Sequence, residues 1–186
     1  MRYIISLILL FSSYSFINAK TIMEIEVSGS IDGDIQIELM ENISPNHVKQ
    51  IITLVNNKKY DGVVFHRVIE DFMAQTGDVK FGNSNSENYN LSLAGTGGSD
   101  LPDLKAEFSN IAHERGTLSM ARSNDPNSAN SQFFICFEAA PFLDRNYTVF
   151  GKVVDGMSHV DQIKKGDSNN NGSVTDPDKI ISFRSK

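Results

Sequence analysis

The chain has 186 residues, of which 40% are hydrophobic, and this is enough to build the core of one globular domain. Its formal net charge is −6 and it has no run of Lys or Arg, so nucleic acid and anionic membrane surfaces are poor partners. The single cysteine, Cys136, excludes an intrachain disulfide. Its apolar neighbours predict a buried, unreactive thiol.

Residues 1–19 have the layout of a secretory signal peptide. Arg2 provides a short positive region, residues 3–16 are almost wholly apolar or small, and Ala19 precedes the expected cut before Lys20. The alternative is a retained N-terminal anchor, but the apolar stretch is shorter than the roughly 20 residues of a membrane span. We therefore expect a periplasmic or secreted protein in which residues 20–186 form one domain without membrane contact.

The first part of this domain has clear signals for local structure. Apolar and polar residues alternate over 23–27 and again over 35–39, with turn residues between them, which predicts a β-hairpin with one buried face. Ser44 and Pro45 then form a helix-start signal. The helical spacing of the apolar residues over 48–55 predicts an amphipathic helix.

Shorter elements are expected further along. Strands are predicted at 63–69, 73–76, 117–121, 132–137, 149–154 and 180–184, and a second helix at 157–165 before Gly166. The Asn-, Ser- and Gly-rich stretch 80–100 predicts a long surface loop. Many short strands with two separated helices predict a mainly-β fold, a closed antiparallel barrel with helical caps.

Three ordered blocks carry the functional signal. The first, 65–69 followed by 72–75, places one arginine and one amide among apolar side chains. The second block, 120–122 with 131–135, repeats that chemistry, and the third consists of 142–144 and 147–153. Such a set suits neither a hydrolytic triad nor a metal. It could bind an apolar residue while hydrogen-bonding its backbone.

Together these blocks resemble the cyclophilin family of peptidyl-prolyl cis–trans isomerases. The resemblance runs from about Met23 to the C-terminus, and Gly95-Thr96-Gly97-Gly98 matches a further motif of the family. It implies an eight-stranded barrel with a helix closing each end. It also implies an isomerase that acts on proline-containing, unfolded or extended polypeptides, assists the folding of exported proteins and needs no cofactor. We expect a monomer.

The resemblance assigns the site residues. Arg67 matches the catalytic arginine, Gln75 is expected to orient it, and 121–123 is expected to form a strip that pairs with an extended peptide. The substrate-binding residues that it implies are Phe72, Met73, Gln75, Gly95, Ala121, Arg122, Ser123, Gln132, Phe134, Phe142, Leu143 and Tyr147. Of these, Phe72, Met73, Phe134 and Leu143 are expected to line the pocket for the proline ring.

The chain departs from many eukaryotic members at three of these positions. Phe142 stands in place of tryptophan, Tyr147 in place of histidine, and Arg122 in place of asparagine. The combination is similar to that of the bacterial exported subgroup. Without the indole N–H donor, we expect weak binding of cyclosporin-type macrocycles.

No metal site is expected. The four histidines are scattered without ligand spacing. The stretch 167–178 has acids and amides at EF-hand-like positions, but Pro177 and an aspartate at the last position favour an ordinary turn.

Two other functions are weighed against the isomerase. A non-catalytic peptide-binding or chaperone module could use the same groove, but such a module would not need Arg67. A carbohydrate- or ligand-binding β-barrel would require the three matched blocks to be coincidence.

Overall fold

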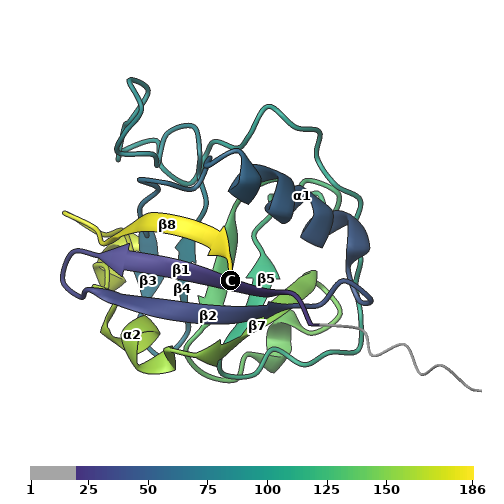
Figure 1. Cartoon of the computed structure of the whole chain (residues 1–186). Coiled ribbons are helices and arrows are strands. Elements are labelled where there is room, and N and C mark those ends of the chain that lie inside the picture. Colours follow the sequence, from purple (N-terminus) through teal and green to yellow (C-terminus); the bar gives the residue numbers. More distant parts are fainter. Residues whose placement is uncertain (1–19) are drawn as a thin grey trace, which may run out of the picture.

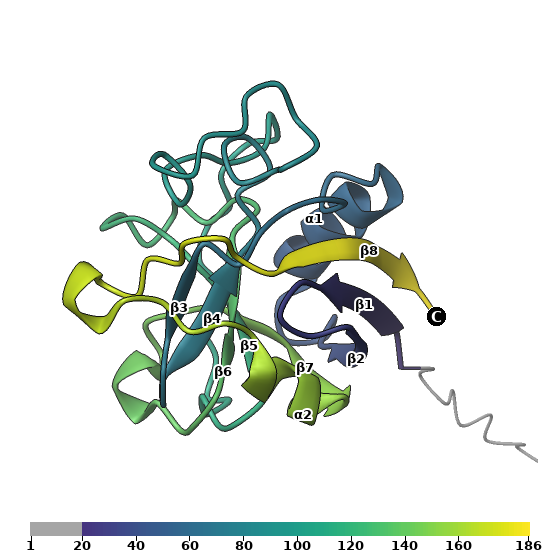
Figure 2. The ribbon, with the colours of Figure 1, turned by 90° about the vertical axis from the view of Figure 1, so that its left-hand side faces the viewer.

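The computed structural model describes residues 20–186, and the predicted signal peptide lies outside the described residues. The strands and helices are β1 (Ile22–Ser28), β2 (Gly33–Leu39), α1 (Pro45–Asn56), β3 (Arg67–Ile69), β4 (Met73–Thr76), β5 (Thr117–Met120), β6 (Phe133–Cys136), β7 (Val149–Asp155), α2 (Met157–Gln162) and β8 (Lys179–Ser185), with short 3-10 helices η1 (Pro141–Leu143) and η2 (Ser168–Asn170). The strands form a curled sheet with α1 and α2 on opposite sides of it (Figure 1; Figure 2).

All eight strands belong to one antiparallel sheet in the order β3-β4-β6-β5-β7-β2-β1-β8. This confirms the predicted mainly-β, eight-stranded fold with two helices. The closure is less complete than predicted, because β3 and β8 form the two edges of the sheet in the described part of the chain. An isolated bridge between Val64 and Lys179 connects the two edges there. The sheet is therefore a curled half-barrel.

The predicted hairpin is confirmed as β1 and β2. Ile25 pairs with Ile35 in register, and both side chains are fully buried. The alternate residues of each strand point away from the core, as the two-residue period of a strand requires. The hairpin thus supplies one wall of the core.

The helix α1 begins and continues as its sequence predicts, but its N-terminus is satisfied in another way. The hydroxyl of Ser44 donates to the carbonyl of Val149 at 2.9 Å and makes no capping bond. Instead, the carboxylate of Glu107 accepts from the backbone N–H groups of Asn46 and His47, each at 3.1 Å from Oε2. A residue from a distant loop therefore caps the helix, which local spacing could not predict.

Two predicted elements are shorter by three residues or more in the structure. The strand expected at 63–69 begins only at Arg67, because residues 63 and 64 make isolated bridges outside a ladder. The second helix ends at Gln162, so Gly166 does not end it. Ile163 takes an extended conformation (φ −53°, ψ 130°), and its side chain is buried in the main core. The helix ends before Ile163 because the extended backbone there lets this side chain pack into the core.

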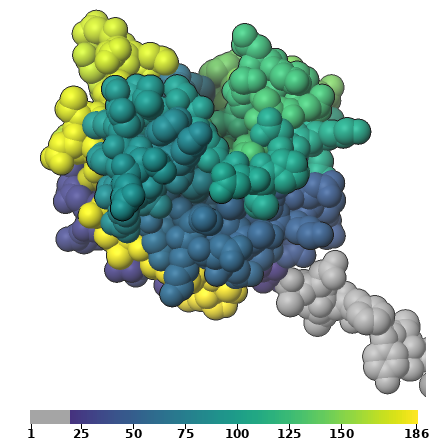
Figure 3. Space-filling view, turned by 90° about the horizontal axis from the view of Figure 1, so that it is seen from above, coloured from purple at the N-terminus to yellow at the C-terminus, as the bar shows by residue number. Residues whose placement is uncertain are grey.

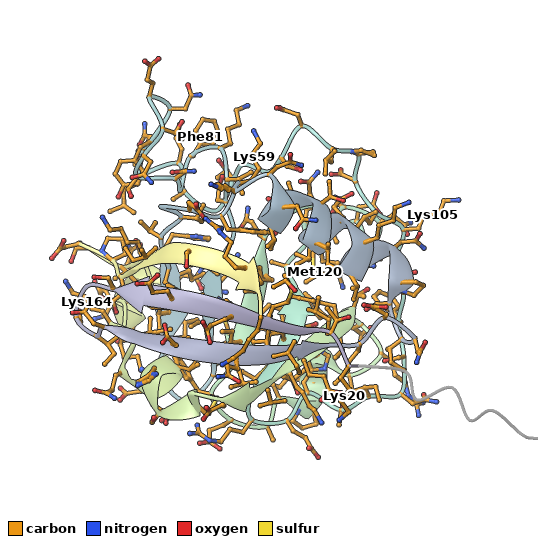
Figure 4. The ribbon with its side chains drawn as sticks, in the orientation of Figure 1. Lys20, Lys59, Phe81, Lys105, Met120 and Lys164 are labelled. Atoms are coloured by element: carbon orange, nitrogen blue, oxygen red, sulfur yellow. The ribbon has the colours of Figure 1, made fainter. Side chains whose placement is uncertain are left out.

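The core lies inside the curl of the sheet. Met120, at the centre of Figure 4, is 1% exposed, whereas the labelled lysines lie at the periphery. The ring of Phe133 packs edge-on against those of Tyr60 and Phe150, each with centroids 5.7 Å away. The predicted burial of Cys136 is confirmed, and this burial raises the pKa of its thiol to about 12.

The calcium-like stretch is used for turns. The buried carboxylate of Asp178 accepts from the backbone N–H groups of Ser30 and Lys164, and that of Asp167 accepts from Asn169 N at 2.9 Å. These bonds occupy the two carboxylates that open and close the pattern. Within residues 20–186, no cluster of His, Cys, Asp and Glu is arranged to hold a metal, and no helix is long and apolar enough to cross a membrane.

Candidate active site

Arg67 lies at the start of the edge strand β3, and distant parts of the chain hold its guanidinium. Nε donates to the carbonyl of Asn171 and Nη2 to Oδ1 of the same residue, both at 3.0 Å. Nη1 donates to Oε1 of Gln75 at 3.1 Å, a contact through which Gln75 can take the orienting role that the resemblance assigns to it. Partial burial lowers the pKa of Arg67, but a guanidinium stays charged throughout the physiological range.

A chain of side-chain amides continues from this arginine. Nε2 of Gln75 donates to Oε1 of Gln132 at 3.0 Å. Nε2 of Gln132 then donates to the carbonyls of Gly95 and Gly97, at 3.0 and 2.7 Å. Each amide uses its oxygen and its nitrogen in the network, which fixes its orientation. The structure therefore brings Arg67, Gln75, Gln132 and Gly95 together, as the sequence assignment required.

The amide chain ends on a residue that the sequence analysis missed. Asp78 is fully buried, and one of its oxygens accepts from the backbone N–H groups of Gly95 and Gly97, both at 2.8 Å. The other oxygen accepts from Lys80 at 3.0 Å and Phe81 at 2.9 Å. An aspartate directly after a predicted strand and a glycine is a common turn signal, and it could have marked this position.

Asn171 is the second residue that the sequence analysis did not place in the site. From the sequence, Asn171 was assigned only to the calcium-like stretch 167–178. Its backbone has φ 52°, in the left-handed region that asparagine tolerates better than most residues. This conformation belongs to the turn that offers both its carbonyl and its side-chain oxygen to Arg67.

An apolar pocket lies next to Arg67, and we call it the ring pocket. The buried side chains of Met73, Phe134 and Leu143 form a small apolar cluster apart from the main core. The residues that line the pocket are Arg67, Phe72, Met73, Gln75, Ala121, Arg122, Phe134, Phe142, Leu143 and Tyr147. The four residues that the sequence assigned to the proline ring are therefore together in one pocket.

Aromatic rings form the rim of the ring pocket. The rings of Phe72 and Phe142 lie 5.3 Å apart, and Phe142 is 68% exposed. Tyr147 packs edge-on against Phe134 at 5.9 Å, and the guanidinium of Arg122 lies 4.4 Å above the Tyr147 ring. This cation–π contact holds Tyr147 in place.

In the strip at 121–123, alternate backbone N–H groups face the protein, as the two-residue period of an extended segment requires. The N–H of Ala121 donates to the carbonyl of Gln132, and that of Ser123 to the hydroxyl of Ser128, both at 2.9 Å. This leaves Arg122 to supply the backbone N–H of the strip. Its guanidinium donates to the carbonyl of Asn146, which fixes the side chain over Tyr147.

A buried polar group supports the pocket from behind. The ring of His113 stacks on Phe134 with centroids 6.3 Å apart, and its Nδ1 and Nε2 lie 2.9 and 3.0 Å from Asp144 Oδ1 and Ser119 Oγ. Hydrogen bonds from the backbone and ring of His113 lower the pKa of the Asp144 carboxyl. His47, His66 and His113 are buried, so the histidines lie mainly inside the protein.

His66 gives the protein a defined sensitivity to acid. Burial is the main cause that lowers the pKa of its ring to about 4, below an unfolded value near 6.5. Between pH 4 and pH 6.5, His66 is therefore protonated in the unfolded chain but neutral in the folded protein. We expect acidification from pH 7 to 4 to lower the free energy of unfolding by about 3 kcal/mol through this residue.

Urea unfolding at both pH values would test this expectation. The His66→Gln variant should lose less stability on acidification than the wild type. His159→Gln, a change at a half-buried histidine of α2, is the matched control and should behave like the wild type. An equal acid loss in the wild type and His66→Gln would contradict the prediction.

Comparison with known proteins agrees with this geometry. The sequence pattern described as "Cyclophilin type peptidyl-prolyl cis-trans isomerase/CLD" matches residues 22–185. The fold and the pocket thus define a prolyl isomerase domain, and the chain belongs to the cyclophilin-type peptidyl-prolyl isomerase family.

Two bacterial relatives of similar sequence support this assignment. A probable peptidyl-prolyl cis-trans isomerase of Brucella suis is 59% identical over 150 residues, which cover 81% of this chain and 76% of the relative. A peptidyl-prolyl cis-trans isomerase of Acinetobacter baylyi is 37% identical over 188 residues, covering 96% and 91% of the two chains. These relatives agree with the resemblance to bacterial members.

Solved structures give the same assignment. The cyclophilin AquaCyp293 from Hirschia baltica has a TM-score of 0.70 at 27% identity, covering 88% of this chain and 73% of that one. A cyclophilin-type isomerase from Cryptosporidium parvum, crystallised in the presence of the dipeptide Ala-Pro, has a TM-score of 0.73 at 25% identity, covering 89% and 98%.

Proposed function

We propose that this protein accelerates rotation about Xaa-Pro peptide bonds in unfolded or extended polypeptides, with Arg67 as its catalytic residue. The observation that carries the proposal is the guanidinium of Arg67, held by Asn171 and Gln75 at the wall of the ring pocket. A fixed donor next to an apolar pocket suits a proline ring and its imide nitrogen.

The chemistry needs no covalent intermediate and no cofactor. Rotation must break amide resonance against a barrier of ~18–20 kcal/mol, whereas the cis and trans forms before proline differ by only about 0.5–1 kcal/mol. In the twisted transition state the imide nitrogen becomes pyramidal and gains a lone pair. A hydrogen bond from Arg67 to that lone pair stabilises the transition state more than the ground state, which lowers the barrier.

The rigidity of the site supports this role. Arg67 is connected through Gln75 and Gln132 to backbone carbonyls at Gly95 and Gly97. A donor held in advance loses little entropy when the transition state forms. Isomerisation of a short Xaa-Pro peptide by residues 20–186 is the direct test, and no acceleration by a well-folded chain would favour the binding module.

The setting of this activity is part of the proposal. The signal-peptide pattern at residues 1–19 supports export to the periplasm or secretion, and the net negative charge of the chain suits a monomer. Proline-containing segments of exported proteins that have not finished folding would be its substrates. Detection of the protein in the periplasmic fraction, with Lys20 as its first residue, would test this part.

Cyclosporin-type macrocycles are expected to bind weakly. Phe142 stands at the rim with 68% exposure, and its ring carries no hydrogen-bond donor. Phe142→Trp introduces an indole N–H and should tighten binding by about 2- to 13-fold, the range that one neutral hydrogen bond contributes. Calorimetric titration of both proteins with cyclosporin checks this, and tight binding by the wild type would refute it.

A further inference from the structure

The proposed isomerase uses the ring pocket and, from the long loop that follows Asp78, only the carbonyls of Gly95 and Gly97. The loop at 79–97 is anchored at both ends by one buried carboxylate, because Asp78 accepts from Lys80 and Phe81 at its start and from Gly95 and Gly97 at its end. A backbone hydrogen bond also fixes the middle of this loop. Asn90 donates from its backbone to the carbonyl of Phe81, near the end of α1 where Figure 4 labels Phe81 and Lys59.

The end of this loop borders a second cavity on the other side of Arg67. One wall consists of His66, Arg67 and Gln75, a second is formed by residues within 91–96, and a third by residues within 170–175. Figure 3 shows the loop (teal) beside the yellow C-terminal part, the two segments that supply the second and third walls. The second cavity shares Arg67 and Gln75 with the ring pocket.

The lining of the second cavity favours negative charge. Of the described residues that line it, Arg67 carries a charge at neutral pH and none is an acid. His66 is neutral there, because burial lowers its pKa to about 4. Two acids lie near the cavity but outside its lining. Asp78 is buried behind Gly95, where four backbone N–H groups donate to its carboxylate. The side chain of Asp176 is fully exposed and lies 3.5 Å from Lys164.

Polar donors are unequally distributed between the two outer walls. On the loop wall, the hydroxyl of Ser92 donates to Asn90 Oδ1, and that of Thr96 donates to the carbonyl of Leu93, both at 2.7 Å. On the opposite wall, the side chains of Asn170, Ser173 and Thr175 make no hydrogen bond to any of residues 20–186. These three groups can donate to a ligand, while Leu91, Ala94 and Val174 offer apolar contact to its methylene groups.

We propose that the second cavity is a substrate subsite that takes an acidic side chain a few residues from the proline and disfavours lysine there. This inference rests on the proposed isomerase function. Because Arg67 is a wall of both cavities, a polypeptide with its proline in the ring pocket reaches the second cavity by crossing one side chain. The overall charge of −6 would by itself favour lysine-bearing peptides, so a preference for glutamate must come from a local site.

Prolyl isomerisation of paired peptides tests the subsite. Each pair carries Glu or Lys at one, two or three positions before or after an Ala-Pro unit. At the position that reaches the cavity, we expect kcat/KM to be about two- to fivefold higher for Glu, the range of an exposed ion pair. Thr175→Asp should bring this ratio to one or below. Ser158→Asp adds the same charge on α2, outside the cavity, and should keep the wild-type ratio.

A binding measurement separates the subsite from the catalytic proposal. Titration of 15N-labelled protein with the preferred Glu peptide should shift the amide signals of Leu91, Ser173 and Thr175, and the Lys peptide should shift them less. If no peptide is isomerised but these shifts occur, the function fails and the subsite stands. Equal kcat/KM for Glu and Lys at every position, or a Glu preference that Thr175→Asp leaves unchanged, would overturn the subsite.

Discussion

Arg67→Ala is expected to lower kcat/KM for a short Xaa-Pro peptide by about 10²–10³-fold, the usual effect of removing one donor aimed at developing charge. The ring pocket would remain, because its apolar floor comes from β4, β6 and η1. Substrate binding should therefore change less than kcat. Arg67→Lys should fall between the wild type and the alanine variant, because an ammonium cannot bond Asn171 and Gln75 with the fixed fork of a guanidinium.

The measurement needs a control for folding and for charge. Arg115→Ala removes a surface arginine that pairs with Asp161, so it changes the net charge equally and should keep wild-type activity. Thermal unfolding of each variant would establish that the fold is intact. Equal acceleration by the wild type and Arg67→Ala would keep the isomerase and exclude Arg67 as its catalytic residue.

Asp78→Ala is expected to have the largest effect on stability. The change leaves four backbone N–H groups without their acceptor, at both ends of the loop. An unsatisfied buried donor costs about 1–3 kcal/mol, and the two glycine N–H groups alone should remove about 2–6 kcal/mol from the free energy of unfolding. Asp78→Asn should cost less, since one amide oxygen can still accept.

Asp78 should also act as a positioning residue for catalysis. Gly95 and Gly97, which it holds, accept the amide of Gln132, and this amide orients Gln75 toward Arg67. We therefore expect the Asp78→Asn variant to lose kcat while its KM stays near the wild-type value at a temperature where it is folded. Asp176→Asn, at a fully exposed aspartate, is the matched control. Wild-type stability and kcat in Asp78→Asn would contradict both expectations.

Much of the fold could be predicted because its signals are local. The two-residue alternation over β1 and β2 and the helical spacing over α1 depend on neighbouring residues, and each of these elements formed as expected. The element ends were predicted less well. The start of β3 and the end of α2 depend on isolated bridges and on the burial of Ile163, which involve distant contacts.

Periodic patterns along the chain predicted the mainly-β architecture with its hairpin and helices. The ordered motifs that resemble the cyclophilin family assigned the ring-pocket residues and the arginine beside them. The residues that hold that arginine could be identified only once the chain is folded. Asn171 lies 104 positions from Arg67, and Asp78 reaches the site through Gly95 and Gly97. Such hydrogen bonds depend on how the curled sheet brings its loops together. The residues next to Arg67 or Asp78 in the sequence do not indicate which distant residues will form these hydrogen bonds.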